Sequence, residues 1–233
     1  MTATTTVSYS QKSSFRLLSY NVRNGKGMDG KTDLTRIAAV LKKANADVVA
    51  IQELDSMTKR SNNTDVLSIL AKETGLFNTY GAAIDYGGGK YGVGILSREK
   101  PIASYTVPLP GREEKRVLLV TEFNDYVIFC THLSLTDADR LASIAIIDSQ
   151  ATRYIKPIYL LGDLNAEPFS PTIAALKENW KQLSNDDSTF PSPSPKKCID
   201  FVFSRNSRKK VTNAAVIDEP VASDHRPLLV ELK

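Results

Sequence analysis

Short apolar segments of four to eight residues recur along the chain, and turn-forming residues separate them. They are rich in Val, Ile, Leu and aromatic residues, which is typical of β-strands. The Gly87-Gly88-Gly89 and Asn124-Asp125 turns are expected to join hairpins. The pattern predicts strands over residues 15–21, 47–53, 77–84, 91–97, 102–107, 116–123, 126–133, 158–164, 199–204, 211–217 and 226–232.

Helical spacing of apolar residues occurs in fewer places. One surface helix is expected after Asp33 and a second before Gly75, since these residues are typical helix boundaries. The apolar faces comprise Leu34, Ile37, Ala38 and Leu41 in the first helix and Val66, Ile69 and Leu70 in the second.

Two further helices are predicted from their starting signals. Residues 137–153 follow Thr136, and Asp139 stands three residues later, which is the spacing of a capping box. The fourth helix follows Ser170-Pro171, because serine is a good N-cap and proline is tolerated at the first helical position.

The order of these elements indicates the fold class. Strands with helices between some of them, without a break in composition, predict two sheets packed face to face with helices outside, in one domain over residues 15–233. Residues 1–14 are Thr/Ser-rich and aperiodic, so we expect a disordered leader there. Residues 184–197 hold three prolines among serines and predict a long, mobile polar loop.

Composition excludes several classes of protein. Of the 233 residues 42% are hydrophobic and 24% charged, which excludes overall disorder, collagen and a coiled coil. No apolar run approaches the ~20 residues of a membrane-spanning helix. We also expect the protein to be a monomer. The amino terminus lacks the regions of a signal peptide, so the sequence as numbered reads as cytoplasmic. Export stays open, because a signal peptide could have been removed.

The net charge of +4 suits an anionic partner without demanding one. The two cysteines, Cys130 and Cys198, show no metal-binding spacing and lie in apolar runs, so buried free thiols are favoured over a disulfide. Only two histidines exist, His132 and His225, and any imidazole chemistry must use them.

Ionisable and amide residues interrupt or end the apolar strands at six places. Singly, each favours a structural interpretation as a turn cap or a solvated side chain. Together they share one context, the polar end of a hydrophobic strand, and strand ends of one sheet can converge on one cleft. The residues are Asn21, Glu53, His132, Asp163 with Asn165, Asp200 and Asp224-His225.

These residue types indicate one reaction class. Carboxylates and an amide are hard oxygen ligands that select Mg²⁺ or Mn²⁺ over zinc. Such an ion also contacts substrate phosphate, and a carboxylate beside an imidazole can activate water. Hydrolysis of a phosphoester follows. The sequence has no G-x-S-x-G motif, Walker A loop or G-x-G-x-x-G loop, which disfavours the competing nucleophile and nucleotide-loop chemistries.

An ordered series of motifs carries a resemblance to a known family. The motifs are SYNVRNG (19–25), IQELD (51–55), GVGILSR (92–98), THLS (131–134), GDLNAEP (162–168), CIDFVF (198–203) and SDHRPLLVEL (223–232). From about residue 15 to its end the chain resembles the endonuclease/exonuclease/phosphatase superfamily, which has the deoxyribonuclease I-like fold. The resemblance implies a four-layer αββα sandwich of two mostly antiparallel sheets flanked by helices. It also implies Mg²⁺- or Mn²⁺-dependent cleavage of a phosphate ester by activated water.

The resemblance assigns roles residue by residue. Glu53 is similar to the principal metal ligand, with Asn21 and Asp224 close to the metal or its waters. His225 resembles the residue that activates water or binds the reacting phosphate, and Asp200 its orienting partner.

Three more residues have counterparts in the family. Asp163 and Asn165 resemble the pair that contacts phosphate and assists proton transfer. His132 resembles the second histidine of the deoxyribonuclease- and sphingomyelinase-like branches, an acid or a phosphate contact. Within the motifs, Arg23 and Arg98 are candidate phosphate contacts, since arginine matches phosphate oxygens bidentately, or structural ion-pair partners.

The substrate stays open at this point. The Asn21-Val22-Arg23 sequence departs from the Asn-x-Asn-Gly form of apurinic endonucleases, and the cysteine signature of inositol polyphosphate 5-phosphatases is absent. The basic run Arg205, Arg208, Lys209 and Lys210 suits a nucleic-acid backbone, but a solvated hairpin is favoured. The substrate is a nucleic acid, a lipid phosphate or a small phosphate. The alternative function is a non-catalytic phosphate- or nucleic-acid-binding relative, which the complete set of expected residues disfavours.

Overall fold

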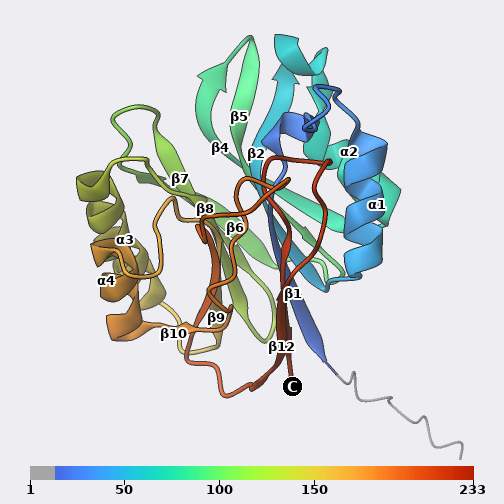
Figure 1. Ribbon diagram of the computed structural model, residues 1–233. Coiled ribbons are helices and arrows are strands. Elements are labelled where there is room, and N and C mark those ends of the chain that lie inside the picture. The colour runs from blue at the N-terminus through green and yellow to red at the C-terminus, as the bar shows by residue number, and fades with distance from the viewer. Residues whose placement is uncertain (1–13) are drawn as a thin grey trace, which may run out of the picture.

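The structure, a computed structural model, describes residues 14–233 and stacks two β-sheets between two pairs of helices (Figure 1). The strands of the seven-stranded sheet are, in spatial order, β12 (Val211–Val216), β13 (Leu228–Leu232), β1 (Phe15–Asn21), β2 (Val48–Thr58), β5 (Gly89–Ser97) and β4 (Phe77–Tyr86), with β3 (Thr64–Asp65) paired to β2. Those of the six-stranded sheet are β10 (Lys181–Gln182), β11 (Asp200–Arg205), β9 (Ile158–Asp163), β8 (Val127–His132), β7 (Arg116–Glu122) and β6 (Ala103–Leu109).

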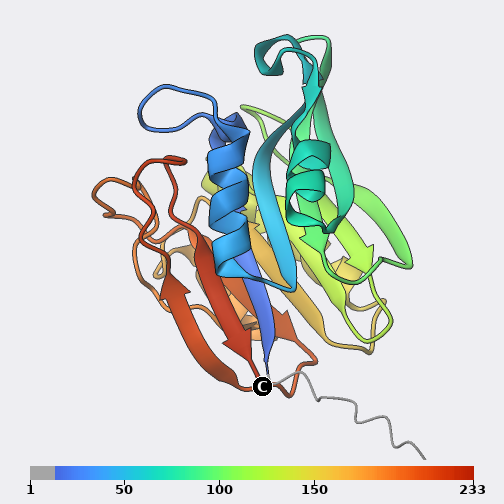
Figure 2. The same ribbon diagram turned by 90° about the vertical axis from the view of Figure 1, so that its right-hand side faces the viewer.

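Helices cover the outer face of each sheet. Figure 1 shows α1 (Leu34–Ala44) and α2 (Val66–Thr74) on one side and α3 (Asp137–Ala151) and α4 (Pro171–Asn179) on the other. Seen from the side in Figure 2, α1 and α2 lie in front of the seven-stranded sheet. One apolar cluster fills the space between the sheets, and one lies under each helix pair. The predicted four-layer αββα sandwich is confirmed.

Each sheet contains one parallel pair among antiparallel neighbours. β1 runs parallel to β2, with Asn21 opposite Gln52. β8 runs parallel to β9, with His132 opposite Asp163. The carboxyl ends of these central strands therefore point to the same edge of the sandwich, which brings their polar terminal residues together.

All eleven predicted strands are present, and both predicted hairpins are confirmed by the antiparallel β4–β5 and β7–β8 pairs. The strands β3 and β10 were missed because two residues carry no readable periodicity. Three helix starts are capped by side chains, namely Asp33, Asp65 and Ser170.

Two details of the helix predictions are wrong. Thr136 makes no side-chain capping bond to α3, and its N–H donates to the Ser134 hydroxyl instead of the Asp139 carboxylate, which pairs with the Arg112 guanidinium over 3.0 Å. Ile69 is 38% exposed, although the spacing placed it on the buried face of α2. The predicted capping box is thus replaced by an ion pair to the loop before β7.

Residues 184–197 differ from the expected mobile loop. The backbone N–H groups of Thr189 and Phe190 donate to the carbonyl of Lys197 over 2.8 and 3.1 Å. The buried Ser192 hydroxyl donates to the Ser223 carbonyl over 2.6 Å. These bonds fasten the loop beside the segment before β13, which argues against the mobility expected from its composition.

The remaining expectations concern the cysteines and the chain's amino-terminal part. Cys130 and Cys198 are free, buried thiols. The predicted leader over residues 1–14 lies, except for Ser14, outside the described residues. Within residues 14–233, no helix is long and apolar enough to cross a membrane.

Candidate active site

Polar side chains from both sheets meet at one edge of the sandwich, around the carboxylate of Asp163. Its Oδ2 atom accepts a hydrogen bond from Nδ2 of Asn21 over 3.1 Å. The same oxygen lies 3.4 Å from Nε2 of His132 and 3.5 Å from Nε2 of His225. Four of the predicted site residues, distant in sequence, are therefore in direct contact.

Glu53 reaches this cluster because β2 bulges where the residue stands. The pairing of β2 with β5 shifts register between Ile51 and Leu54. Glu53 there has a φ of +59°, a left-handed conformation that residues with side chains rarely adopt. Its Oε1 atom accepts a hydrogen bond from Nδ2 of Asn21 over 3.0 Å. Bulges and strained residues of this kind are concentrated at functional sites, where they re-aim a side chain.

A tight turn after β9 fixes Asp163. The backbone N–H of Asn165 donates to Oδ1 of Asp163 over 2.9 Å, and its side-chain amide donates to the carbonyl of Leu133 over 2.9 Å. The φ of Asn165 is +47°, which asparagine tolerates better than most residues. The turn engages one carboxylate oxygen of Asp163 and leaves the other directed at the cluster.

His225 and Asp200 form a buried dyad. Nδ1 of His225 donates to Oδ2 of Asp200 over 2.8 Å, and the Thr189 hydroxyl donates to the same oxygen. The ring of Phe190 packs 4.9 Å from that of His225, between centroids. Burial lowers the pKa of His225, but the Asp200 and Asp163 carboxylates outweigh it and raise the pKa to about 10. The two carboxylates therefore favour the charged form of His225.

His132, in contrast, favours its neutral form. Burial lowers its pKa to about 4, and although Asp163 opposes this, the nearby Arg116 and His225 cations lower it further. The two histidines flank Asp163, one neutral and one charged. This difference between neighbouring groups is the arrangement that separates acid, base and charge-stabilising roles in a site.

The cluster opens into a pocket of about 640 Å³, which Glu53, Asp224 and both histidines line. Burial raises the pKa of Glu53, and the Asp224 and Asp163 charges add to this effect. Carboxylates that repel one another in a half-buried site favour a cation between them, and hard oxygen donors suit Mg²⁺ or Mn²⁺. The donor set therefore fits a divalent cation.

Two geometric details bear on which residues hold it. Asp163, Asp200 and His225 each offer one ligand atom within 4.8 Å of the others. A metal on those atoms would break the hydrogen bond between His225 and Asp200, so we regard this group as a hydrogen-bonded unit and not as the metal site. Asn21 turns its Nδ2 toward Glu53 while its Oδ1 accepts from the backbone of Arg23 over 3.1 Å. Asn21 thus orients Glu53 in this structure.

The structure separates the two predicted phosphate-contacting arginines. Nε of Arg23 lies 3.4 Å from Oδ2 of Asp224, beside the pocket. Arg98 instead pairs with Asp47 over 3.2 Å, next to the first residue of β2 and at the end of that strand away from Glu53. The structure does not bring Arg98 to the site. Of the two roles expected for Arg98, phosphate contact and ion-pair partner, the ion pair is the one observed.

Sequence reasoning missed Arg116 and Arg140, which line the same pocket and are only 8% and 6% exposed. The Arg116 guanidinium pairs with Glu113 and Glu114, and its buried Nε has no hydrogen-bond partner among the described residues. Arg116 is the first residue of β7 and ends a charged run, so the sequence there predicts only the start of a strand. Periodicity gives no signal that its side chain turns into a cavity.

Comparisons with known proteins identify the family and the fold. The model of the Endonuclease/Exonuclease/phosphatase family matches residues 18–225. An endonuclease/exonuclease/phosphatase from Beutenbergia cavernae is 22% identical, covers 94% of this chain and 71% of its own, and superposes with a TM-score of 0.77. An endonuclease/exonuclease/phosphatase from Bacteroides vulgatus is 18% identical. The match covers 95% of this chain and 99% of that one, and the TM-score is 0.79.

A mannosyl-6-phosphatase from Bacteroides thetaiotaomicron has the same fold. It is 17% identical, the match covers 94% of this chain and 99% of that one, and the TM-score is 0.77. No curated protein sequence matches the chain. Likeness at these identities concerns the fold alone.

Proposed function

We propose that this chain, which belongs to the endonuclease/exonuclease/phosphatase family, is a divalent-metal-dependent hydrolase of phosphate esters. The observation that carries the proposal is the position of Asp163. Its Oδ2 atom is within 3.5 Å of a neutral histidine, a cationic histidine and the asparagine that orients Glu53. A scaffold without a reaction to perform would gain nothing from burying these charges together.

Glu53 and Asp224, with Asn21 beside them, would hold Mg²⁺ or Mn²⁺. The metal, when bound, offsets the negative charge of the phosphate and polarises its oxygens. Asn21 keeps the Glu53 carboxylate aimed into the pocket through the 3.0 Å hydrogen bond.

His225 binds a non-bridging oxygen of the reacting phosphate as a cation. A general base must be unprotonated at the working pH, whereas His225 is charged well above neutrality. Of the two roles that the family resemblance leaves open, phosphate binding is therefore the one supported. Asp200 and Thr189 hold the ring and its charge in place.

Asp163 accepts the proton of the attacking water, while the P–O bond to the leaving group breaks and the leaving oxygen takes a proton from solvent. Asp163 lines the pocket, and the Asn165 turn occupies its Oδ1 atom while Oδ2 lies among the site residues. His132, neutral and 3.4 Å from the same oxygen, contacts the substrate from the opposite side. Arg116 and Arg140 add positive charge to the wall of the pocket, and we propose Arg116 as the phosphate contact in place of Arg98.

The pocket volume of about 640 Å³ is that of a small-molecule site, so a small phosphate ester is the expected substrate. The test is turnover of p-nitrophenyl phosphate and bis-p-nitrophenyl phosphate with Mg²⁺ or Mn²⁺, with and without a chelator. We expect chelator-sensitive turnover of at least one. Equal release with and without the chelator, or no turnover on a wider panel of phosphate esters, would refute the proposal.

A further inference from the structure

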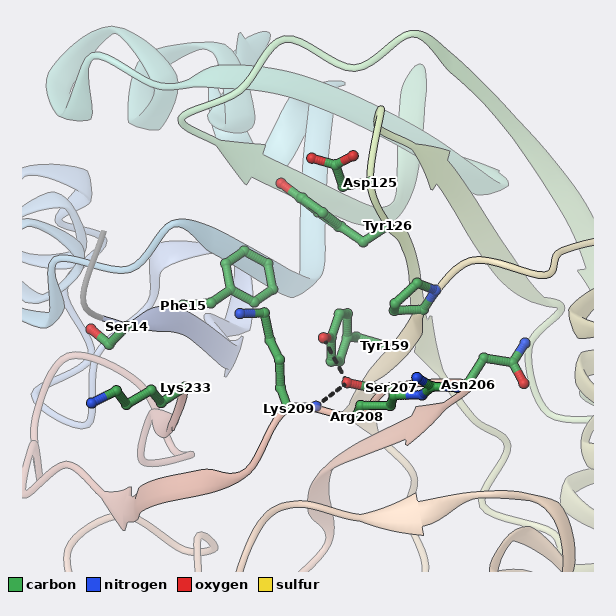
Figure 3. Close-up of a pocket in the computed structure, with 11 residues that line it drawn as sticks. Ser14, Phe15, Asp125, Tyr126, Tyr159, Asn206, Ser207, Arg208, Lys209 and Lys233 are labelled. Atoms are coloured by element: carbon green, nitrogen blue, oxygen red, sulfur yellow. Dashed lines mark hydrogen bonds between the residues drawn. The ribbon is translucent and has the colours of Figure 1, made fainter. Parts of the chain in front are cut away.

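A second pocket, of about 580 Å³, lies at the end of the sandwich away from the active site (Figure 3). β1 begins there with Phe15 and ends at Asn21 in the active site, and β9 likewise runs from Tyr159 near this pocket to Asp163. At about 3.3 Å per strand residue the two sites are roughly 15–20 Å apart. They are therefore separate.

One wall of this pocket is aromatic. Phe15 lies 4.9 Å from Tyr126 and 5.5 Å from Tyr159, between ring centroids. The hydroxyl of Tyr159 is hydrogen-bonded to that of Ser207 over 3.0 Å, which holds the β11–β12 loop against the rings. In Figure 3 the side chain of Lys209 extends from that loop toward the rings. Tyr159 is buried, whereas Phe15 and Tyr126 are partly exposed, so the last two rings offer the apolar surface that a flat ligand would contact.

The rim of the pocket is basic. Arg208, Lys209 and Lys233 line it, and Asp125 supplies the one acidic side chain among the described lining residues. Among the ion pairs of residues 14–233, none involves these three cations, whereas Arg205 of the same basic run lies 3.8 Å from Asp148. Of the four basic residues that sequence reasoning assigned to a solvated hairpin, Arg205 is paired, Arg208 and Lys209 line the pocket, and Lys210 does neither within the described part of the chain.

We propose that this pocket binds a small aromatic anion of the nucleoside monophosphate type, with its base against the Phe15–Tyr126 wall and its phosphate at Arg208 and Lys209. Charge complementarity selects an anion, and the ring wall selects a planar aromatic group; proteins that bind single-stranded nucleic acid combine the same two features for each nucleotide. The volume is in the range of small-ligand sites. A sugar phosphate would use only the rim, and a free nucleoside only the wall.

The test is calorimetric titration of the full chain with AMP, adenosine and ribose 5-phosphate, in excess chelator so that metal at the active site does not contribute. We expect AMP to bind. Adenosine and ribose 5-phosphate should each bind at least about tenfold more weakly than AMP, because each keeps only one of the two groups that the pocket recognises. The double variant R208E/K209E should weaken AMP at least as much, and F15L should weaken AMP and adenosine alike.

Two controls separate this site from general electrostatics and from the active site. K72E/K177E makes the same charge change at exposed positions of α2 and α4 and should leave AMP binding unchanged. H225A should also bind AMP normally, whatever its effect on hydrolysis. Undiminished AMP binding by R208E/K209E, equal binding of ribose 5-phosphate, or loss of binding in H225A would each overturn the proposal.

Discussion

Nδ1 of His225 donates a hydrogen bond to Oδ2 of Asp200 over 2.8 Å, and both side chains are almost completely buried. The carboxylate therefore keeps His225 protonated at pH values where a free imidazole, with a pKa near 6.5, is neutral. Whether the cation or the free base of His225 serves the reaction can be decided from the pH dependence of variants.

Asp200→Asn should move the alkaline limb of the pH–rate profile to lower pH. The raised pKa of His225, about 10, means that the charged form is lost only as the pH rises through that value. Removing the Asp200 charge lowers this pKa, so activity that requires the cation should fail earlier on the alkaline side. The measurement is kcat/KM against pH for both proteins. A shift confined to the acid limb would instead identify His225 as the base.

His225→Ala should reduce kcat by roughly 10²–10⁴, the range for a positioned acid–base or charged group, while the far-UV circular dichroism stays unchanged. Arg98→Ala is the matched control, because Arg98 pairs with Asp47 away from the pocket. A kcat for His225→Ala close to that of Arg98→Ala would remove His225 from the mechanism.

Glu53→Gln should raise the Mg²⁺ concentration needed for half-maximal activity and, without metal, should raise Tm. Burial and two neighbouring carboxylates raise the pKa of Glu53, so its ionisation opposes folding once the pH exceeds the carboxyl's ordinary range. The amide removes that charge and also weakens the proposed ligand. Thermal melts with chelator and with Mg²⁺ test both halves. An unchanged Mg²⁺ requirement would show that Glu53 is not the ligand.

Arg116→Lys should lower kcat/KM by roughly 10–100-fold, since a lost hydrogen bond to a charged group is worth about 1.5–3 kcal/mol. Lysine keeps the charge but cannot present a planar fork to phosphate. Part of the loss could arise from the ion pairs with Glu113 and Glu114, so Glu113→Gln is the comparison. An equal loss in both variants would indicate that Arg116 only supports the loop.

The sequence predicts this fold well because strands buried between two sheets are long apolar runs that end in turn residues. It predicts Asp163 and His225 as site residues for the same reason, since each is an ionisable group attached to such a run. The bulge that turns Glu53 into the pocket cannot be predicted from the sequence, because the position of the bulge depends on how β2 pairs with β5. Arg116 was missed because nothing local distinguishes a buried arginine from a solvated one.

The loop over residues 184–197 is the clearest case in which composition misled. Serine and proline content predicts mobility, yet Thr189 and Ser192 are buried and bonded to Asp200 and Ser223. These partners are distant in sequence, and the bonds exist only once β11 and the segment before β13 are in place. The loop is thus part of the site, and its polar residues have structural roles.

Thr189→Val tests that role of the loop. Valine matches threonine in shape but leaves Asp200 without the hydroxyl donor, and the other oxygen of Asp200 already lacks a partner among the described residues. Oδ2 of Asp200 keeps its bond from His225, so we expect a loss of about 1.5–3 kcal/mol in the free energy of unfolding by urea, the contribution of a hydrogen bond to a charged group. Thr212→Val, at an exposed position of β12, should change stability by much less. If the two variants are equally stable, the bond from Thr189 to Asp200 contributes nothing, and the loop is held to the dyad by packing alone.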